Sequence, residues 1–193
     1  MRLVLASRSP RRADLLTAAG YEFAVTPADI DERRCDDETA TEYVGRLASE
    51  KAAIVTAGAP DAMVLGADTV VVIEGLVLGK PVDEADAAAM LHRLSGRSHE
   101  VLTGVALLSR GRRRTEVVTT RVTFRTLTAV DVGWYVASGE PVGKAGAYAI
   151  QGRASRFVTR IEGSYSNVVG LPVATVDEMI RASGAASPTD PGA

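Results

Sequence analysis

The sequence has few of the residues that support redox and zinc chemistry. Its 193 residues include one cysteine, Cys35, and two histidines, His92 and His99. One cysteine excludes an intrachain disulfide, and this set is too small for the usual zinc site. The neighbours of Cys35 are charged and no histidine lies near it in sequence, so a nucleophilic thiolate is not favoured. The low cysteine content fits a reducing compartment and predicts a cytoplasmic protein.

The chain also lacks a large charge excess and any long apolar run. A formal net charge of −2 gives no bulk electrostatic case for binding nucleic acid or an anionic membrane. No uncharged apolar stretch approaches the roughly 20 residues of a membrane span, and the N-terminal apolar run is too short for a signal peptide. With 46% hydrophobic residues, however, the chain has enough apolar surface for a folded core.

Strand-like and helix-like segments alternate along the chain. Two helices begin with the capping-box spacing, Thr39 with Glu42 and Thr128 with Asp131, and Asp83 can cap a third. The alternation predicts an α/β fold with a mixed central sheet, formed as one domain over residues 1–183. The small polar tail over 184–193 is expected to be disordered. The expected strands are 2–6, 22–26, 62–65, 69–73, 76–78, 100–108, 115–127 and 157–161, and the expected helices are 10–19, 39–57, 83–94, 128–139 and 174–182.

Ligands of such sheets bind where strands end, and the loop after the first strand is one such place. Ser7 is followed by Arg8, Arg11 and Arg12 at the start of a helix. Arginine there is unfavourable by about 0.3–1 kcal/mol each, because the helix N-terminus is itself partly positive. A bound phosphate would reverse the sign of that effect. The alternative is a solvated basic turn or a partner for the acidic stretch 29–32, and this segment alone leaves both open.

A second place is the expected turn at Asp68, between two hydrophobic runs. A carboxylate there must be paired, bind a metal or face a cleft, which favours a catalytic group over a structural turn residue. Lys51 shares one helical stripe with Val44, Leu47 and Val55, so it faces the core side. Its ammonium can snorkel out of the core or reach an anion in the cleft, and the other basic groups favour the anion.

Two further segments are weaker indications. Lys80, in the loop Gly79–Pro81, lies across a hairpin from Asp68. The glycine-rich stretch 143–152 contains Gln151, whose amide offers the donor and acceptor needed to contact the edge of a nucleobase. Each segment alone can equally be an ordinary solvated connection.

The ordered set of these segments resembles the Maf family of nucleoside triphosphate pyrophosphatases. The resemblance spans residues 3 to about 180. It is carried by Leu5-Ala6-Ser7-Arg8-Ser9-Pro10-Arg11-Arg12, Asp31-Glu32, Ser49-Glu50-Lys51-Ala52, Gly66-Ala67-Asp68-Thr69, Gly79-Lys80-Pro81, Leu94-Ser95-Gly96, Thr103-Gly104-Val105, Gly143-Lys144-Ala145-Gly146-Ala147-Tyr148, Ile150-Gln151-Gly152, Ile161-Glu162-Gly163-Ser164-Tyr165 and Val169-Gly170-Leu171-Pro172.

The resemblance implies a twisted mixed sheet in two lobes with a deep cleft, like that of inosine triphosphatases. It implies a hydrolase that cleaves the α–β phosphoanhydride of a nucleoside triphosphate with a divalent cation, Mg²⁺ or Mn²⁺, and it is compatible with a homodimer. By resemblance, Asp68 is the proton acceptor. The residues implied for the phosphate and metal site are Ser7, Arg11, Arg12, Glu32, Lys51 and Lys80, with Glu32 and Asp68 as metal ligands. Thr69, Gln151 and the pair Arg11-Arg12 resemble the branch acting on dTTP and UTP rather than on 7-methyl-GTP.

Three questions stay open at this point. Asp68 can act as the base that deprotonates water or mainly as a metal ligand. Some members of the family are linked to septum formation and arrest of cell division, so a nucleotide-binding regulator with little catalysis is one alternative. A nucleotidyltransferase is another, although no separate segment for a second substrate is evident. A positioned carboxylate argues against the regulator, because binding alone does not need one.

Overall fold

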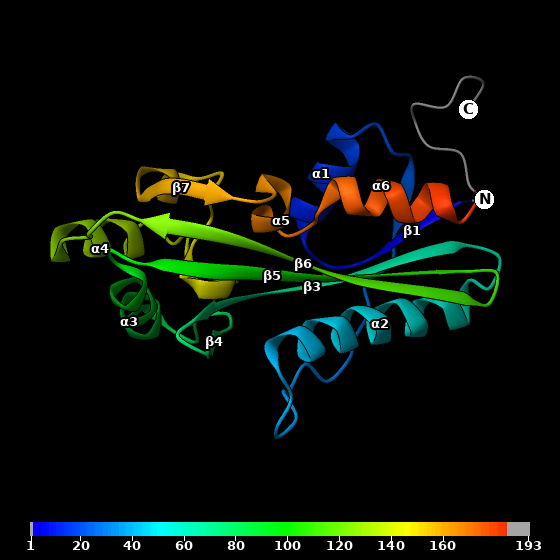
Figure 1. The fold of residues 1–193 in the computed structure, drawn as a ribbon, viewed down its shortest axis with the longest axis horizontal. Helices are drawn as coiled ribbons and strands as arrows, with labels where there is room; N and C mark the ends of the chain where they lie inside the picture. Colours follow the sequence, from blue (N-terminus) through cyan, green and yellow to red (C-terminus); the bar gives the residue numbers. More distant parts are fainter. Residues whose placement is uncertain (1, 185–193) are drawn as a thin grey trace. The chain divides into compact units, whose positions relative to one another are not determined.

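The computed structural model describes residues 2–184, so the tail over 185–193 lies outside the described residues. The chain divides into two compact units. The first holds the residues up to Asp68, then Thr103–Val118, then those from Gly170 on, and the second holds Thr69–Leu102 and Thr119–Val169. The helices and strands carry the labels of Figure 1. Within residues 2–184, no helix is both long and apolar enough to cross a membrane.

Within the described residues, the strands form a seven-stranded sheet in the order β2-β1-β3-β5-β6-β7, with β4 paired to β3. The β1 strand runs parallel to β2 and β3, whereas β3 with β4 and β6 with β7 are antiparallel. The sheet is therefore mixed, and the prediction of an α/β fold is confirmed. The strands are β1 (Leu3–Ala6), β2 (Phe23–Val25), β3 (Met63–Ile73), β4 (Leu76–Leu78), β5 (Ser98–Ser109), β6 (Arg112–Phe124) and β7 (Val158–Glu162).

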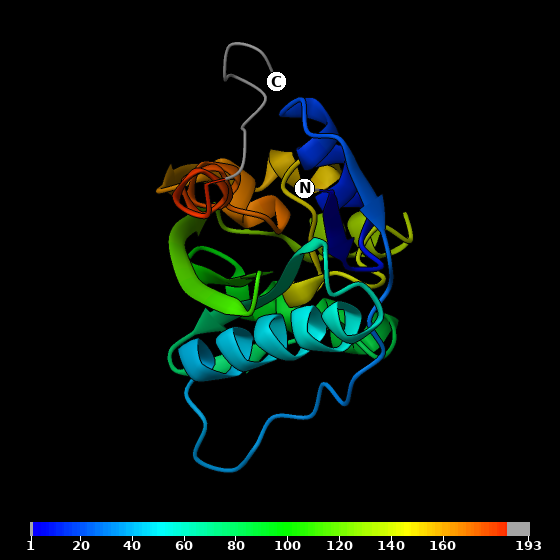
Figure 2. The same ribbon diagram turned by 90° about the vertical axis from the view of Figure 1, so that its right-hand side faces the viewer.

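In the first unit, alternate residues of β1 and β3 face opposite sides of the sheet, as the period of two requires. Leu5 and Leu65 pack under α1 (Pro10–Ala18) and α6 (Val173–Ala182). On the other face, residues such as Val4 and Val64 pack against α2 (Ala40–Gly58). Figure 2 shows α2 along one face and α1 with α6 on the other. Two layers of helices therefore enclose the first-unit strands.

Helix α2 begins and faces inward as the sequence predicts. The Thr39 side chain accepts a hydrogen bond from the backbone N–H of Glu42, and the Glu42 carboxylate accepts one from the backbone N–H of Thr39. Val44, Leu47 and Val55 are buried, and Lys51 is buried with them. The predicted stripe is confirmed, and it places an ammonium group on the sheet side of the helix.

The prediction that a strand ends at the turn around Asp68 is wrong. The β3 strand is continuous from Met63 to Ile73, so Asp68 lies in its middle. The first half of β3 pairs with β1, and the second half pairs with β4 in the hairpin. The β-branched residues after Asp68 favour an extended backbone, so one strand extends through both runs.

Two other helices begin at the caps that the sequence predicts, whereas the shortest elements are not predicted by it. The helices α3 (Glu84–Leu94) and α4 (Ala129–Val136) carry the predicted caps at Asp83 and Thr128. The five-residue helix α5 (Tyr165–Val169) is not predicted, because it is too short to show a helical period. The 3-10 turns η1 (Ala145–Ala147) and η2 (Arg153–Arg156) are missed for the same reason.

The second unit is built around aromatic rings. Phe124, Tyr148 and Phe157 are buried and pack edge to face, and His99 joins them with its ring 5.0 Å from that of Phe124. The His99 Nε2 lies 2.9 Å from the hydroxyl of Tyr148, and no described residue hydrogen-bonds its Nδ1. Burial lowers the pKa of His99 from its ordinary value of 6.5 to about 4. The neutral imidazole is therefore part of the core.

We expect acid to destabilise the protein through His99, because the unfolded chain takes up this proton near pH 6.5 and the folded chain only near pH 4. The stability from this group is complete above pH 6.5 and is lost as the pH falls to about 4, by about 3 kcal/mol. His99→Gln keeps a polar partner for Tyr148 without titrating, so its unfolding free energy should fall less over that range. Urea unfolding at pH 7 and 4.5 measures this, with the exposed His92→Gln as control. Equal pH slopes in His99→Gln and the wild type would contradict it.

Candidate active site

Asp68 faces α2 because of the strand period. Val64, Gly66 and Asp68 alternate along β3 toward the same face, and Val64 packs against α2. Lys51 stands opposite on the inner stripe of α2, and its Nζ lies 2.7 Å from the Asp68 Oδ1. Both residues are buried, at 7% and 9% exposure, so each charge has a partner of opposite sign. The structure thus joins the two residues that the sequence singles out in this region.

Glu32 reaches the same ammonium from the loop after β2. Its Oε1 lies 2.6 Å from the Lys51 Nζ. The Tyr43 hydroxyl, from α2, donates a hydrogen bond of 2.6 Å to the backbone oxygen of Glu32 and so holds this loop against the helix. Lys51 therefore lies between two carboxylates that come from different elements, one on a strand and one on a loop.

Tyr43 is a residue that the sequence reasoning missed. Burial is the main cause that raises its pKa, and the carboxylates of Asp68 and Glu32 raise it further. Its spacing of eight residues from Lys51, two helical turns, is the signal that could have found it. We assign it the role of positioning the Glu32 loop.

Arg12 joins three segments of the chain beside these carboxylates. Its Nη1 donates to the Ser7 Oγ at 3.1 Å and to the Ala67 oxygen at 2.9 Å, and its Nε donates to the Gly170 oxygen at 2.8 Å. Burial lowers the pKa of Arg12, and the charge of Asp68 opposes that effect. Because a guanidinium stays protonated in proteins, the buried side chain places a fixed positive charge next to Asp68 and Glu32.

The two other arginines of this segment, Arg8 and Arg11, are less buried than Arg12. Arg11 is half-buried, and burial lowers its pKa. Arg8 is exposed and pairs with the exposed Asp29 at 3.3 Å. The alternative of a partner in the acidic stretch is therefore correct for Arg8, to which the resemblance gives no role.

Thr69, Lys80 and Gln151 belong to the second unit. There the backbone N–H of Gly146 donates to the Gly79 oxygen at 2.9 Å, so the loop with Lys80 lies beside the glycine-rich segment. Gly146 has a φ of 65°, and a β-carbon on it would lie 2.7 Å from a methyl of Val71, so glycine is required. That Thr69, Lys80 and Gln151 join the first-unit residues at one substrate stays a prediction.

The turn that carries Gln151 is fixed by a polar clamp. The Tyr135 hydroxyl accepts from the Ala149 N–H and donates to the Glu140 carboxylate at 2.8 Å. Glu140 accepts in turn from the backbone N–H of Arg153 at 3.0 Å. The backbone is thus held on both sides of the exposed Gln151.

The donor set of Glu32 and Asp68 suits a hard divalent cation. Both carboxylates approach one positive centre, the Lys51 Nζ, so their oxygens are close enough to share a cation. Among residues 2–184, no cluster of three or more histidine, cysteine, aspartate or glutamate side chains is arranged to hold a metal. Two carboxylates fit Mg²⁺, which usually keeps several waters and takes phosphate oxygens as further ligands.

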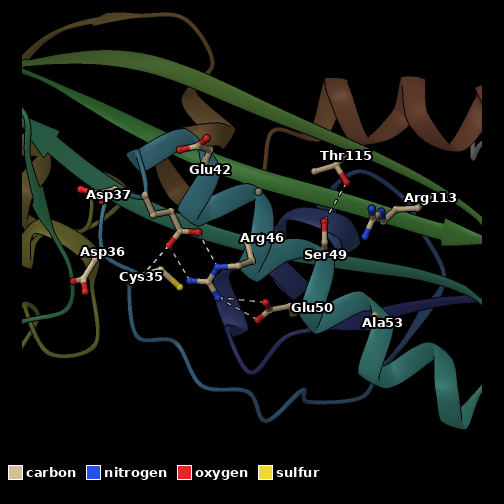
Figure 3. Close-up of a pocket in the computed structure, with 12 residues that line it drawn as sticks. Cys35, Asp36, Asp37, Glu42, Arg46, Ser49, Glu50, Ala53, Arg113 and Thr115 are labelled. Carbon is tan, nitrogen blue, oxygen red and sulfur yellow. Dashed lines mark hydrogen bonds and ion pairs between the residues drawn. The ribbon is translucent and has the colours of Figure 1, made fainter.

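A separate groove of about 770 Å³ lies on the outer face of α2 (Figure 3). The Arg46 guanidinium bonds Glu38 at 2.7 Å and lies 3.3 Å from Glu50, and Ser49 bonds Thr115 at 3.1 Å. The exposed Cys35 is at its edge, and none of the predicted site residues lines it. Arg46 and Ser49 thus bond partners within the groove itself.

The solved structure of the Staphylococcus aureus Ham1 protein resembles this fold, with a TM-score of 0.52 over 95% of this chain and 100% of that one. At 13% identity, this likeness concerns the fold alone.

Sequence relatives are much closer. A protein of Syntrophus aciditrophicus named dTTP/UTP pyrophosphatase is 51% identical over 185 residues, which cover 95% of this chain and 90% of the relative. A Myxococcus xanthus protein of the same name is 53% identical over 182 residues, which cover 94% of this chain and 92% of that protein. The family model described as "Maf-like protein" matches residues 2–183. The resemblance inferred from the motifs is confirmed, and the chain belongs to the Maf family.

Proposed function

We propose that this Maf protein hydrolyses dTTP and UTP, and modified pyrimidine nucleotides of similar shape, to the monophosphate and pyrophosphate. The relatives' shared name supports the substrate. The observation that carries the reaction type is the buried pair of Lys51 and Asp68, which the exposed Glu32 joins at the Lys51 ammonium, next to the guanidinium of Arg12. Cleavage of a phosphoanhydride needs charge neutralisation and a directed water, and this group offers cations and a carboxylate for both.

In this proposal the cationic side chains hold the triphosphate and Asp68 accepts a proton from the water that attacks the α-phosphorus. Arg12 holds the loop after β1 against the middle of β3 and contributes its charge, while Ser7 and Arg11 contact phosphate oxygens. Glu32 and Asp68 would hold Mg²⁺ or Mn²⁺. Such a cation supplies charge neutralisation on the phosphate oxygens. Lys80 from the second unit completes the phosphate contacts.

Release of pyrophosphate from a nucleotide panel tests the proposal. The panel contains dTTP, UTP, CTP, 5-methyl-UTP and 7-methyl-GTP, each with Mg²⁺ and with water as the only acceptor. We expect release from dTTP, UTP and 5-methyl-UTP well above that from the other two. Tight binding of UTP without release would support a nucleotide-binding regulator. A requirement for a second alcohol or phosphate acceptor would support a transferase.

Gln151→Ala should change base preference more than it changes phosphate handling. Loss of hydrogen bonds to the pyrimidine edge should cost roughly 1–3 kcal/mol, so kcat/KM for UTP should fall on the order of tenfold relative to CTP. The ratio of kcat/KM values measures this. Arg153→Ala, an exposed change in the same clamped turn, is the control. An equal loss for every nucleotide would show that Gln151 does not contact the base.

We infer further that the enzyme works in the cytoplasm and as a homodimer. The single exposed cysteine fits a reducing compartment, and the dimer follows from the resemblance to the family. Sedimentation at micromolar concentration measures the oligomeric state.

A further inference from the structure

The ammonium of Lys51 lies where the divalent cation is expected. Its Nζ is 2.7 Å from an Asp68 oxygen and 2.6 Å from a Glu32 oxygen, and these are the two carboxylates assigned to the metal. A Mg²⁺ bound directly to both would need oxygens at about 2.0–2.1 Å around itself. The ammonium and the metal would then lie within about one atomic diameter of each other, so both cannot be held by the same pair of oxygens.

The charges in this part of the site also balance without a metal. Lys51 and Arg12 bring two positive charges, and Asp68 and Glu32 bring two negative charges. Arg11 is close enough to Arg12 to lower its pKa and adds a further positive charge. The free protein therefore has no excess negative charge here to attract a divalent cation. A triphosphate brings that excess with it.

Lysine is suited to a change of partner at this position. Its stem is buried in the α2 stripe with Leu47 and Val55, and only its Nζ touches the carboxylates. An ammonium on a flexible four-carbon stem is a point charge that can turn from one anion to another. The fixed guanidinium of Arg12, with its Nε and Nη1 bonded to backbone and Ser7, cannot move in this way.

We propose that Lys51 is an exchangeable internal cation that holds Asp68 and Glu32 together in the free protein. Divalent metal enters with the triphosphate, whose oxygens take over the Lys51 ammonium as the metal takes over the two carboxylates. This inference rests on the proposed function for the identity of the triphosphate. Metal and nucleotide then bind with positive coupling. The metal frees the Lys51 ammonium for the phosphate oxygens, and the phosphate oxygens free the two carboxylates for the metal.

Mn²⁺ binding without nucleotide tests the exchange directly. The fraction of free Mn²⁺ is measured by electron paramagnetic resonance for the wild type and for Lys51→Met, which keeps the length of the stem and removes the charge. We expect Lys51→Met to bind Mn²⁺ roughly 10–100-fold more tightly than the wild type, within the usual range of coupling between two ligands. Lys144→Met removes a lysine elsewhere and should leave Mn²⁺ binding unchanged. Lys51→Met combined with Glu32→Gln should return it to the wild-type value.

A second measurement, made on the wild type, tests the proposal even if the Lys51→Met variant does not fold. For the wild type, Mn²⁺ affinity is compared with and without an α,β-methylene analogue of UTP, with binding of Mn²⁺ to the analogue itself subtracted. The exchange requires the analogue to tighten Mn²⁺ binding at least tenfold. Equal Mn²⁺ affinity with and without it, or a folded Lys51→Met with no gain, would overturn the proposal and make Lys51 a permanent structural partner.

Neither measurement uses turnover. If UTP is not hydrolysed but Lys51→Met gains Mn²⁺ affinity, the reaction assignment falls and the cation exchange stands. If UTP is hydrolysed but neither Mn²⁺ experiment shows coupling, only the exchange is overturned.

Discussion

Asp68→Asn is expected to lower kcat for pyrophosphate release from UTP on the order of 10²–10⁴-fold, the usual contribution of a general base. Asparagine has the same shape and keeps an oxygen within reach of the Lys51 ammonium, 2.7 Å away in the wild type. It cannot accept the proton of the attacking water, because an amide is not basic. The rate of pyrophosphate release at saturating UTP and Mg²⁺ measures the change in kcat.

The matched control is Asp61→Asn, an exposed aspartate in the turn before β3. It makes the same chemical change in the same unit, so its activity should stay at the wild-type level. Because Asp68→Asn removes one charge of a buried pair, its thermal unfolding must also be measured. A folded Asp68→Asn enzyme with near-full activity would show that the proton goes elsewhere.

The same variant separates the two roles left open for Asp68. If Asp68 is mainly a metal ligand, the loss in Asp68→Asn should shrink as Mg²⁺ or Mn²⁺ is raised, because mass action offsets a weaker site. If Asp68 is the base, the loss should persist at saturating metal. A metal titration of kcat distinguishes these outcomes.

The helical parts of the site could be predicted, because each residue involved sits in a regular pattern. The spacing of Val44, Leu47 and Val55 fixes the inward face of α2, and so it fixes where Lys51 lies. The capping residues Thr39 and Glu42 set the start of that helix. The local sequence is therefore enough to predict the start of this helix and its buried face.

The position of Asp68 could not be predicted from local sequence in the same way. A glycine before an acid suggests a turn, and only the pairing of β3 with β1 and then β4 shows that the strand continues. The contact of Lys51 with Glu32 depends on a long loop, which Tyr43 holds through a backbone oxygen. Neither contact has a periodic signal, because each joins segments that are distant in sequence.

Gly66→Ala is expected to cause a large loss of stability in the first unit. A β-carbon at Gly66 would lie 2.1 Å from the carbonyl oxygen of Ala48 and 2.8 Å from the backbone nitrogen of Ala52. Both atoms belong to the backbone of α2, so no side-chain rotation can relieve the overlap. The helix must move away from β3. Overpacking of this kind costs about 3 kcal/mol or more, which corresponds to a fall in Tm of about 6–12 °C for a chain of this length.

Thermal and urea unfolding measure this loss, and the chain offers a control on the same helix. Gly58 is the last residue of α2, and a β-carbon there would meet nothing within 4 Å. Gly58→Ala should therefore leave stability unchanged or raise it by up to about 1 kcal/mol. Gly104→Ala, where a β-carbon would lie 2.3 Å from the Val44 oxygen, should resemble Gly66→Ala.

Loss of activity should accompany the loss of stability even in the fraction of Gly66→Ala that stays folded. Gly66 lies two residues before Asp68 on the same face of β3, and Lys51 follows Ala48 on α2 by three residues. Any outward shift of α2 at Gly66 therefore lengthens the 2.7 Å contact between Lys51 and Asp68. Assays below the unfolding range should show kcat reduced in Gly66→Ala and unchanged in Gly58→Ala. A stable Gly66→Ala enzyme with wild-type kcat would mean that the close contact of strand and helix does not set the geometry of the site.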